Sequence, residues 1–484
     1  MSVKQFIQLK KEVLIRIIRA FLSGDFANNA RLIPFEMRPK GTEVSYRCCI
    51  YKERAVLRDR VIAGLGFSIE DDDEITELAQ YANRALERKK PHFQPLTIID
   101  IACKGCAATR VFVTDICQGC VARMCMQSCK FNAITFAAGK SVIDAKKCKN
   151  CKMCISACPY GAIAQIRVPC EDSCPVDAIE KNENGIARID YERCISCGKC
   201  IINCPFGAVH EKSQIVDVLK NLENKSKGVK IIAMTAPSIA GQFPGDIYQL
   251  KSAIIKAGFT DVYEVAMGAD ITIKNEAAEF DERMKEGVPF MTTSCCAGYN
   301  GFIKKHLPDI KKYVSDTKTP LYYTAQKVKS LYPSAITVFI GPCVAKKNEA
   351  FYNDNIDYVI NYEELGALFI AKNIEVLDCE KSEYGVESSK QGRGFGVTSG
   401  VAKAVSFLAK TQSDPVLING LNKQTINVLK QALREGKCAQ GNIVEVMCCE
   451  NGCVGGNAVI CSAKTAQNAL NKLLEKSKDI KKEN

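Results

Sequence analysis

Cysteines spaced for iron–sulfur clusters are the residues best able to do chemistry in this chain. Eight of the 27 cysteines form two copies of the pattern C-x2-C-x2-C-x3-C-P, at residues 148–159 and 194–205. In bacterial ferredoxins such a run supplies three thiolates to one [4Fe-4S] cubane and a fourth to the neighbouring cluster. Each copy therefore predicts a tight loop around a cubane, and each needs a partner motif to complete its set.

A partner for the first copy lies just upstream, where C-x2-C-x4-C-x3-C occupies residues 117–129. Exchange of the last cysteine between the two motifs gives two complete clusters. We predict one set as Cys117, Cys120, Cys125 and Cys158, and the other as Cys148, Cys151, Cys154 and Cys129.

The second copy is completed by cysteines on both sides of this first unit. A Cys-Pro stands at residues 174–175, and an otherwise unused C-x2-C at residues 103–106. Sixteen upstream cysteines then divide into four cubane sets. The third set is predicted as Cys194, Cys197, Cys200 and Cys174. The fourth set is predicted as Cys103, Cys106, Cys170 and Cys204. The first ferredoxin unit would be inserted within the second. The C-x2-C spacing alone also permits zinc at Cys103 and Cys106.

Three further cysteine loops lie in the C-terminal half, at Thr293–Tyr299 (TSCCAGY), Gly341–Glu349 (GPCVAKKNE) and Glu445–Gly456 (EVMCCENGCVGG). Their order and content resemble the signature loops of the [FeFe]-hydrogenases. The resemblance implies an H-cluster, a [4Fe-4S] cubane bridged through Cys453 to a diiron unit with CO and CN⁻ ligands. Its cubane ligands would be Cys296, Cys343, Cys449 and Cys453. Soft thiolates suit such iron–sulfur chemistry.

The same resemblance implies a proton path. Cys295 would relay protons, since a thiol can both accept and donate one. Glu276, Glu279 and Arg283 match the family's channel helix, and Ser315 matches its hydroxyl member. Their spacing of i, i+3 and i+7 places the three charged residues on one helix face, a pattern that without the family usually means solvated charge.

Other matches concern the pocket around the diiron unit. Lys346 would donate a charge-assisted hydrogen bond to a cyanide ligand, whereas its neighbour Lys347 is expected at the surface. The lining residues implied by the resemblance are Ala236, Pro237, Ser238, Phe395 and Met447. The chain departs from the best-known members at Ala297, Tyr299, Leu321, Gly341 and Asn457. These departures spare every implied ligand and relay residue but change the surroundings that tune a metal centre.

The composition limits the classes of protein. The formal charge of +12 would fall to about +2 if five cubanes each carried about −2, which argues against a nucleic-acid partner. The N-terminus shows no cleavable signal pattern and the chain has no apolar run of membrane-spanning length. We therefore expect a cytoplasmic protein without membrane insertion, where reducing conditions suit thiolate ligands.

The expected fold is a helical N-terminal segment, then α+β ferredoxin-like modules, then an α/β iron-hydrogenase catalytic domain. Apolar periodicity predicts helices over residues 6–22 and 75–86, with the acidic run 70–74 as a helix start. Strands are expected at 229–235, 336–341 and 358–360, after a Lys- and Asn-rich boundary at 220–230. The predicted domains are 1–97, 98–212, 228–465 and a Lys-rich tail at 466–484.

These features together predict a hydrogenase that interconverts 2H⁺ + 2e⁻ and H₂. Four accessory clusters would connect the active centre to a ferredoxin or similar redox protein, and maturation proteins would supply the diiron unit. Two alternatives stay open. One is a hydrogen sensor, which in this family usually carries an added signalling domain. The other is a non-enzymatic iron–sulfur assembly protein of the same fold, which would not need Glu276, Glu279, Cys295 and Lys346.

Overall fold

The N-terminal region folds as four helices packed onto the rest of the molecule. The computed structural model describes residues 3–42, 47–103, 106, 110–223, 228–438 and 441–482. The helices are α1 (Val3–Leu22), α2 (Phe26–Met37), α3 (Ile50–Gly64) and α4 (Leu78–Glu87). Their apolar faces, with Ile17, Ile18 and Val61 fully buried, join one core that continues into the C-terminal α/β domain. The predicted helices are present, the second beginning three residues later than expected.

The acidic run at residues 70–74 is not a helix start, which corrects the expectation. It forms turns ahead of α4, and two of its carboxylates are engaged across the fold. Asp72 accepts hydrogen bonds from Arg58 and from the hydroxyl of Tyr81, while Glu70 accepts one from the backbone of Ile98. These contacts with residues outside the run fix it as part of the loop that connects α3 to α4.

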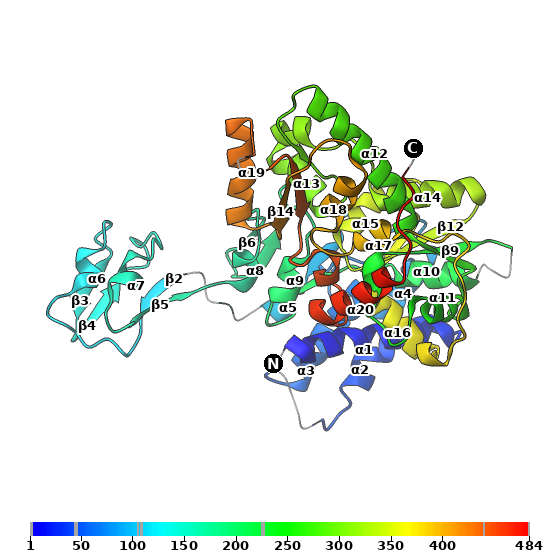
Figure 1. The fold of residues 1–484 in the computed structure, drawn as a ribbon. Helices are drawn as coiled ribbons and strands as arrows, with labels where there is room; N and C mark the ends of the chain where they lie inside the picture. Colours follow the sequence, from blue (N-terminus) through cyan, green and yellow to red (C-terminus); the bar gives the residue numbers. More distant parts are fainter. Residues whose placement is uncertain are drawn as a thin grey trace.

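The ferredoxin-like region consists of short antiparallel strand pairs nested within one another. The outermost pair joins β1 (Leu96–Ile98) to β8 (Val209–Glu211), and inside it lie β2 (Arg110–Val113) with β5 (Ile163–Ile166), β3 (Ile134–Ala137) with β4 (Lys140–Ile143), and β6 (Ile179–Lys181) with β7 (Ala187–Ile189). Its short helices are α5 (Asp100–Cys103), α6 (Met124–Gln127), α7 (Met153–Ala157), α8 (Pro169–Asp172) and α9 (Lys199–Asn203). The part from β2 to β5 stands apart from the rest of the molecule (Figure 1).

Two parallel sheets form the frame of the C-terminal α/β domain. One has the order β10-β9-β12-β13 and the other β11-β15-β14. Their strands are β9 (Ile231–Thr235), β10 (Asp261–Glu264), β11 (Met291–Thr292), β12 (Ile336–Ile340), β13 (Tyr358–Ile360), β14 (Pro415–Asn419) and β15 (Ile443–Met447). The three strands expected from the sequence correspond to β9, β12 and β13. Strands such as β9, β15 and β13 are buried at every position, as parallel strands covered on both faces are.

Helices cover both sheets (Figure 1). They are α10 (Ile215–Glu223), α11 (Ile247–Lys256), α12 (Val265–Lys285), α13 (Ala297–His306), α14 (Pro320–Leu331), α15 (Ala345–Phe351), α16 (Tyr362–Ala371), α17 (Lys390–Gly394), α18 (Gly400–Leu408), α19 (Lys423–Glu435) and α20 (Ala463–Glu475). The described residues also contain the 3-10 turns η2 (Pro237–Ile239), η3 (Pro308–Tyr313), η4 (Val376–Asp378) and η5 (Gly452–Gly455).

The predicted domain boundaries differ from the structure in two places. The Lys- and Asn-rich boundary begins inside α10, and residues 224–227 lie outside the described residues. The expected tail begins within α20, where Ala466 and Leu470 are fully buried. Beyond that helix, the backbone of Ile480 still donates a hydrogen bond to the side chain of Gln391. The last helix is therefore packed as part of the C-terminal α/β domain.

Among the described residues, no helix is both long and apolar enough to cross a bilayer.

Candidate metal centre and proton path

The three cysteine loops meet because each follows the carboxyl end of a parallel strand. Thr293–Tyr299 follows β11, Gly341–Glu349 follows β12, and the cysteines of the third loop follow β15. The segment with Ala236 follows β9 in the same way. Open parallel sheets place their ligand sites outside these strand ends. Four separate stretches of sequence thus converge on one place without any of them being close in the chain.

The structure brings the four implied H-cluster cysteines into one partly buried group. The pKa of Cys343 is raised to about 11, first by burial and then by the charge of Cys296. Burial likewise raises the pKa of Cys453 to about 12, with Cys296 and Cys343 as the next contributions. The pKa of Cys449 is raised by burial and then by the charges of Cys343 and Cys296. Four buried thiolates this close repel one another, and a cationic iron–sulfur core would neutralise them, so the donor set fits such a group.

The implied relay residues form a chain of hydrogen bonds from the buried centre to the surface. Ser315 donates to Glu279 over 2.6 Å from Oγ to Oε2, and it also hydrogen-bonds Glu276. Arg283 pairs with Glu279 at 2.6 Å and with Asp316 at 3.1 Å. Because the side chain of Asp316 is 73% exposed, the chain ends in solvent.

Glu276 is the buried end of this chain. Its side chain on α12 is fully buried, and the backbone N–H of Ser294 donates to its Oε1 over 3.1 Å. Burial raises its pKa to about 7, against the opposing effect of that hydrogen bond. Its other oxygen, Oε2, is buried and has no hydrogen-bond partner within the described part of the chain. A carboxyl with such a pKa can gain or lose a proton near neutral pH.

Cys295 lies beside Glu276 and the cluster cysteines. Burial raises the pKa of its thiol, and the largest charge contribution is that of Glu276, ahead of Cys296. The thiol is therefore protonated at neutral pH. A buried neutral thiol next to a carboxyl of shifted pKa is suited to pass a proton rather than to carry a charge.

Lys346 reaches the buried centre with a carboxylate partner of its own. Its ammonium forms an ion pair with Glu349 at 2.5 Å. Burial alone would lower the pKa of Lys346, but Glu349 and then Cys343 and Cys453 raise it. The side chain thus stays cationic among the cysteines. Sequence reasoning missed Glu349, although it stands three residues after Lys346 in the same helix.

Of the implied lining residues, Ala236, Ser238, Phe395 and Met447 are buried and Pro237 is half-buried, and they belong to different parts of the core. Phe395 and Met447 belong to one apolar cluster, against which Cys295 and Cys296 pack. Ala236 belongs to a second cluster with Leu321. Pro237 and Ser238 begin η2, and the Ser238 hydroxyl lies 2.7 Å from that of Tyr362.

Two charged residues near this site differ from expectation. Lys347 was expected at the surface, and no role was predicted for Glu445. Lys347 is buried and not at the surface, because its ammonium donates to the carbonyl of Lys212 at 2.8 Å and pairs with Glu364 at 3.8 Å. Glu445 on β15 accepts hydrogen bonds from the backbone of Ser399 and Ala402 at the start of α18, each 2.8 Å long. Burial raises the pKa of Glu445 to about 7. The sequence does carry a signal for Glu445, because it is the one charged residue in the otherwise apolar strand β15.

Within the described residues, no group of three or more His, Cys, Asp or Glu side chains could hold a metal ion. A cubane is larger than an ion and holds its thiolates further apart, so its test is an enclosed space between them. Two small cavities meet that test. One is lined by Cys129, Cys148, Cys151 and Cys154, and the other by Cys174, Cys194, Cys197 and Cys200.

The remaining upstream cysteines also fall into groups. Burial raises the pKa of Cys170 to about 12, and the next contributions come from Cys204 and Cys103. The pKa of Cys106 is raised by burial, and both Cys204 and Cys103 add to that effect. Cys103, Cys106, Cys170 and Cys204 therefore lie near one another, and their assignment to a fourth cluster stays a prediction. Of the first set, Cys125 and Cys158 share one apolar cluster, and Cys117 accepts backbone hydrogen bonds from Gly119 and Ser141.

The loop of the third set contacts the hydrogenase-like loops directly. Asn348 donates to the hydroxyl of Ser196 at 2.7 Å, and Asn457 donates to the carbonyl of Cys197 at 3.2 Å. The side chain of Cys448 hydrogen-bonds that of Cys197, while its backbone N–H lies 3.4 Å from the sulfur of Cys296. Cys448 thus contacts both Cys197, a predicted ligand of the third set, and Cys296, a predicted ligand of the buried centre.

Residues 229–457 match the family model described as the iron only hydrogenase large subunit, C-terminal domain. Residues 165–215 match an LdpA Fe-S cluster-binding domain, and residues 141–164 match a 4Fe-4S binding domain. The chain is an [FeFe]-hydrogenase-like protein. The matched domains and the cysteine groups support [4Fe-4S] clusters in it.

Relatives of this hydrogenase-like protein include enzymes and assembly factors. Iron hydrogenase 1 of Clostridium pasteurianum is 29% identical over 303 residues, which cover 51% of this chain and 52% of the relative. The chain thus spans about half the length of that hydrogenase. A cytosolic Fe-S cluster assembly factor of Xenopus tropicalis is 25% identical, over 54% of this chain and 67% of that protein. A solved [FeFe]-hydrogenase of Chlamydomonas reinhardtii is 23% identical, with a TM-score of 0.46 over 56% of this chain and 91% of its own.

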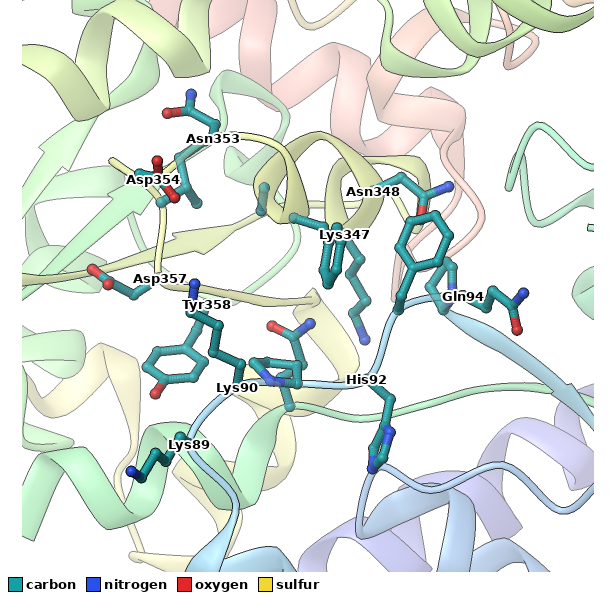
Figure 2. Close-up of a pocket in the computed structure, with 17 residues that line it drawn as sticks. Lys89, Lys90, His92, Gln94, Lys347, Asn348, Asn353, Asp354, Asp357 and Tyr358 are labelled. Atoms are coloured by element: carbon teal, nitrogen blue, oxygen red, sulfur yellow. The ribbon is translucent and has the colours of Figure 1, made fainter. Parts of the chain in front are cut away.

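A pocket separate from the proposed centre is lined in part by residues of α15. Figure 2 shows Lys347 and Asn348 on that helix, facing the segment that carries Lys90, His92 and Gln94. None of the residues implied as catalytic or ligating lines it.

Proposed function

We propose that this hydrogenase-like protein catalyses 2H⁺ + 2e⁻ ⇌ H₂ at an H-cluster held by Cys296, Cys343, Cys449 and Cys453. The observation that carries the proposal is the hydrogen-bonded chain from Glu276 through Ser315 and Glu279 to Arg283. An electron carrier needs no such chain, whereas a centre that consumes or releases protons does. When bound, the H-cluster supplies the electrons and the site at which H₂ is formed or split.

The residues move one proton at a time between solvent and the buried thiol. In H₂ formation, Arg283 and Asp316 hold Glu279 at the surface end, and Glu279 receives a proton from water. Ser315 passes a proton onward by donating from its hydroxyl to Glu276 while it accepts one from Glu279. Cys295 would donate its thiol proton towards the centre, and Glu276 would then return a proton to the thiolate that is left. H₂ oxidation uses the same residues in reverse order.

Lys346 and the apolar walls serve binding rather than proton transfer. The ammonium of Lys346, kept charged by Glu349, would donate to an anionic cyanide ligand. Phe395 and Met447, with the apolar cluster around them, would exclude water, which strengthens that interaction.

Electrons would travel through the upstream cubanes, and the third set would be the last before the centre. Its contacts through Cys448, Asn457 and Asn348 support this order. We propose a ferredoxin-type protein as the external partner, and maturation proteins as the source of the diiron unit.

A second candidate function is iron–sulfur cluster assembly without catalysis, which the assembly-factor relatives favour. Infrared spectroscopy separates the two. Protein produced together with diiron maturation enzymes should show the stretching bands of metal-bound CO and CN⁻. A fully loaded iron–sulfur protein that shows no such bands would favour the assembly function instead.

A further inference from the structure

The module from Arg110 to Ile166 carries an unusual concentration of positive charge. It contains eight Lys or Arg residues and two Asp residues, so that 57 of the 484 residues hold half of the formal charge of +12. All eight cationic side chains are exposed. Even if its two proposed cubanes carried about −2 each, the module would remain near +2. Figure 1 shows the module extending away from the main body, with its outer faces open.

Most of these charges are available to a partner. Within the described part of the chain, the ion pairs of the module are limited to Lys140 with Asp115. Lys149 and Lys152 form no ion pair there, and they flank Cys151 in the sequence. Unpaired cations on an exposed surface attract an oppositely charged protein and accelerate its association.

The proposed second cluster comes close to the surface at this place. The cavity between Cys129, Cys148, Cys151 and Cys154 is also lined by Phe131, Lys149 and Lys152. The side chain of Cys151 is exposed, in contrast to the buried ligand Cys154. Phe131 is 44% exposed and Met153 is 51% exposed. An apolar centre with a charged rim, set over an accessible redox group, has the composition of a small transient interface.

We propose that this surface, formed by Phe131, Lys149, Cys151, Lys152 and Met153, docks a small acidic one-electron carrier protein. Carboxylates of the carrier would pair with Lys149 and Lys152, and its redox group would lie against Cys151. One electron then passes to the cubane, so that the carrier is oxidised and the cubane reduced by one electron each, with no bond made or broken. Only the later use of the electron to form H₂ rests on the proposed function; the docking and the first electron transfer do not.

The rate of this first electron transfer tests the proposal. A chemically reduced acidic ferredoxin is mixed with the cluster-loaded full chain, and bleaching of the accessory clusters is followed by stopped flow. The double variant Lys149→Glu/Lys152→Glu should lower the second-order rate constant about tenfold at low salt. The difference should shrink as added salt screens the charges. The Phe131→Ala/Met153→Ala variant should be slower at every salt concentration.

A matched control changes the total charge equally at a distance from the module. Lys256 and Lys327 are exposed on α11 and α14, and the Lys256→Glu/Lys327→Glu variant should keep the original rate constant within about twofold. An equal loss in both double variants, or a loss in neither, would overturn the proposal. So would tight, salt-sensitive binding of RNA or anionic vesicles at Lys149 and Lys152 together with an unchanged ferredoxin rate.

Two further measurements keep the outcome clear. Iron and sulfide are counted in every variant. If the Lys149→Glu/Lys152→Glu variant loses iron, the Lys149→Gln/Lys152→Gln variant replaces it. The glutamine variant should also lower the rate constant. H₂ evolution from reduced methyl viologen by the unaltered protein is measured separately. A protein that accepts electrons from ferredoxin at this surface but makes no H₂ would contradict the proposed function and not the docking surface.

Discussion

At the scale of single residues, the burial of Glu276 decides how the proposed relay responds to pH. Its pKa of about 7 lies above the ordinary value of 4.5 because burial disfavours the charged form. H₂ formation requires protonated Glu276 as a donor, so its rate should fall as pH rises through about 7. Glu276→Gln should lose a factor of about 10² or more in rate, and the control Glu282→Gln, at an exposed position on the same helix, should not. Equal pH profiles for Glu276→Gln and the unaltered protein would contradict this role.

The same group also makes stability depend on pH. A raised folded pKa means that the folded protein binds the proton more tightly, so the stabilisation is complete below about 4.5 and is lost as pH rises through about 7. For a fully buried carboxyl this amounts to about 3 kcal/mol. Glu276→Gln should therefore lose less thermal stability than the unaltered protein between pH 5 and pH 8, values chosen to bracket that titration. A larger loss in the variant would argue against a buried, protonated Glu276.

Cys448 is expected to set the reduction potential of the neighbouring cluster. Its thiol hydrogen-bonds Cys197, and hydrogen bonds to cluster sulfurs favour the more negative reduced state. Cys448→Ala should shift the potential of the third cluster downward in an EPR-monitored redox titration. Cys461→Ala serves as the control, because it removes a partly buried thiol that belongs to none of the proposed ligand sets. An unchanged potential in Cys448→Ala would remove this residue from the electron path.

At the scale of elements, a buried ion network fixes the N-terminal helices to the catalytic domain. The ammonium of Lys10 on α1 pairs with Glu211 on β8 at 2.6 Å and also with Glu363 on α16. Lys10→Met would leave two buried carboxylates without their cation, which typically costs about 3–5 kcal/mol. The expected result is a clear drop in the midpoint of denaturant unfolding. Lys11→Met changes an exposed neighbour on the same helix and should have little effect; similar midpoints for both variants would show that the network contributes little.

Elements with strong local patterns were predictable, and those defined by distant partners were not. The apolar runs of β12 and β13 identify strands from their composition alone. The acidic residues 70–74 and the segment after α20 could not be placed because their partners, Ile98 for Glu70 and Gln391 for Ile480, lie far away in the sequence. Burial of Lys347 has the same cause, since its acceptors come from other elements.

At the scale of the whole molecule, the chain combines nested cluster modules with a two-sheet catalytic domain. The periodic spacing of Glu276, Glu279 and Arg283 predicts a shared helix face, but it does not reveal that Glu276 is fully buried while the other two approach solvent. That gradient exists only because α12 runs from the buried centre outward past the Ser315 segment. The bridging contacts of Cys448 and Asn457 likewise require both domains to be folded.

The central claim, proton-coupled H₂ chemistry through Cys295, is tested most directly by H₂ evolution from reduced methyl viologen. The unaltered protein, Cys295→Ala and the control Cys438→Ala are each matured and matched by their CO and CN⁻ infrared bands. We predict that Cys295→Ala keeps the bands but loses at least about 10² in rate, while Cys438→Ala stays close to the unaltered protein. H₂ evolution by Cys295→Ala at the full rate, with its bands intact, would contradict the account.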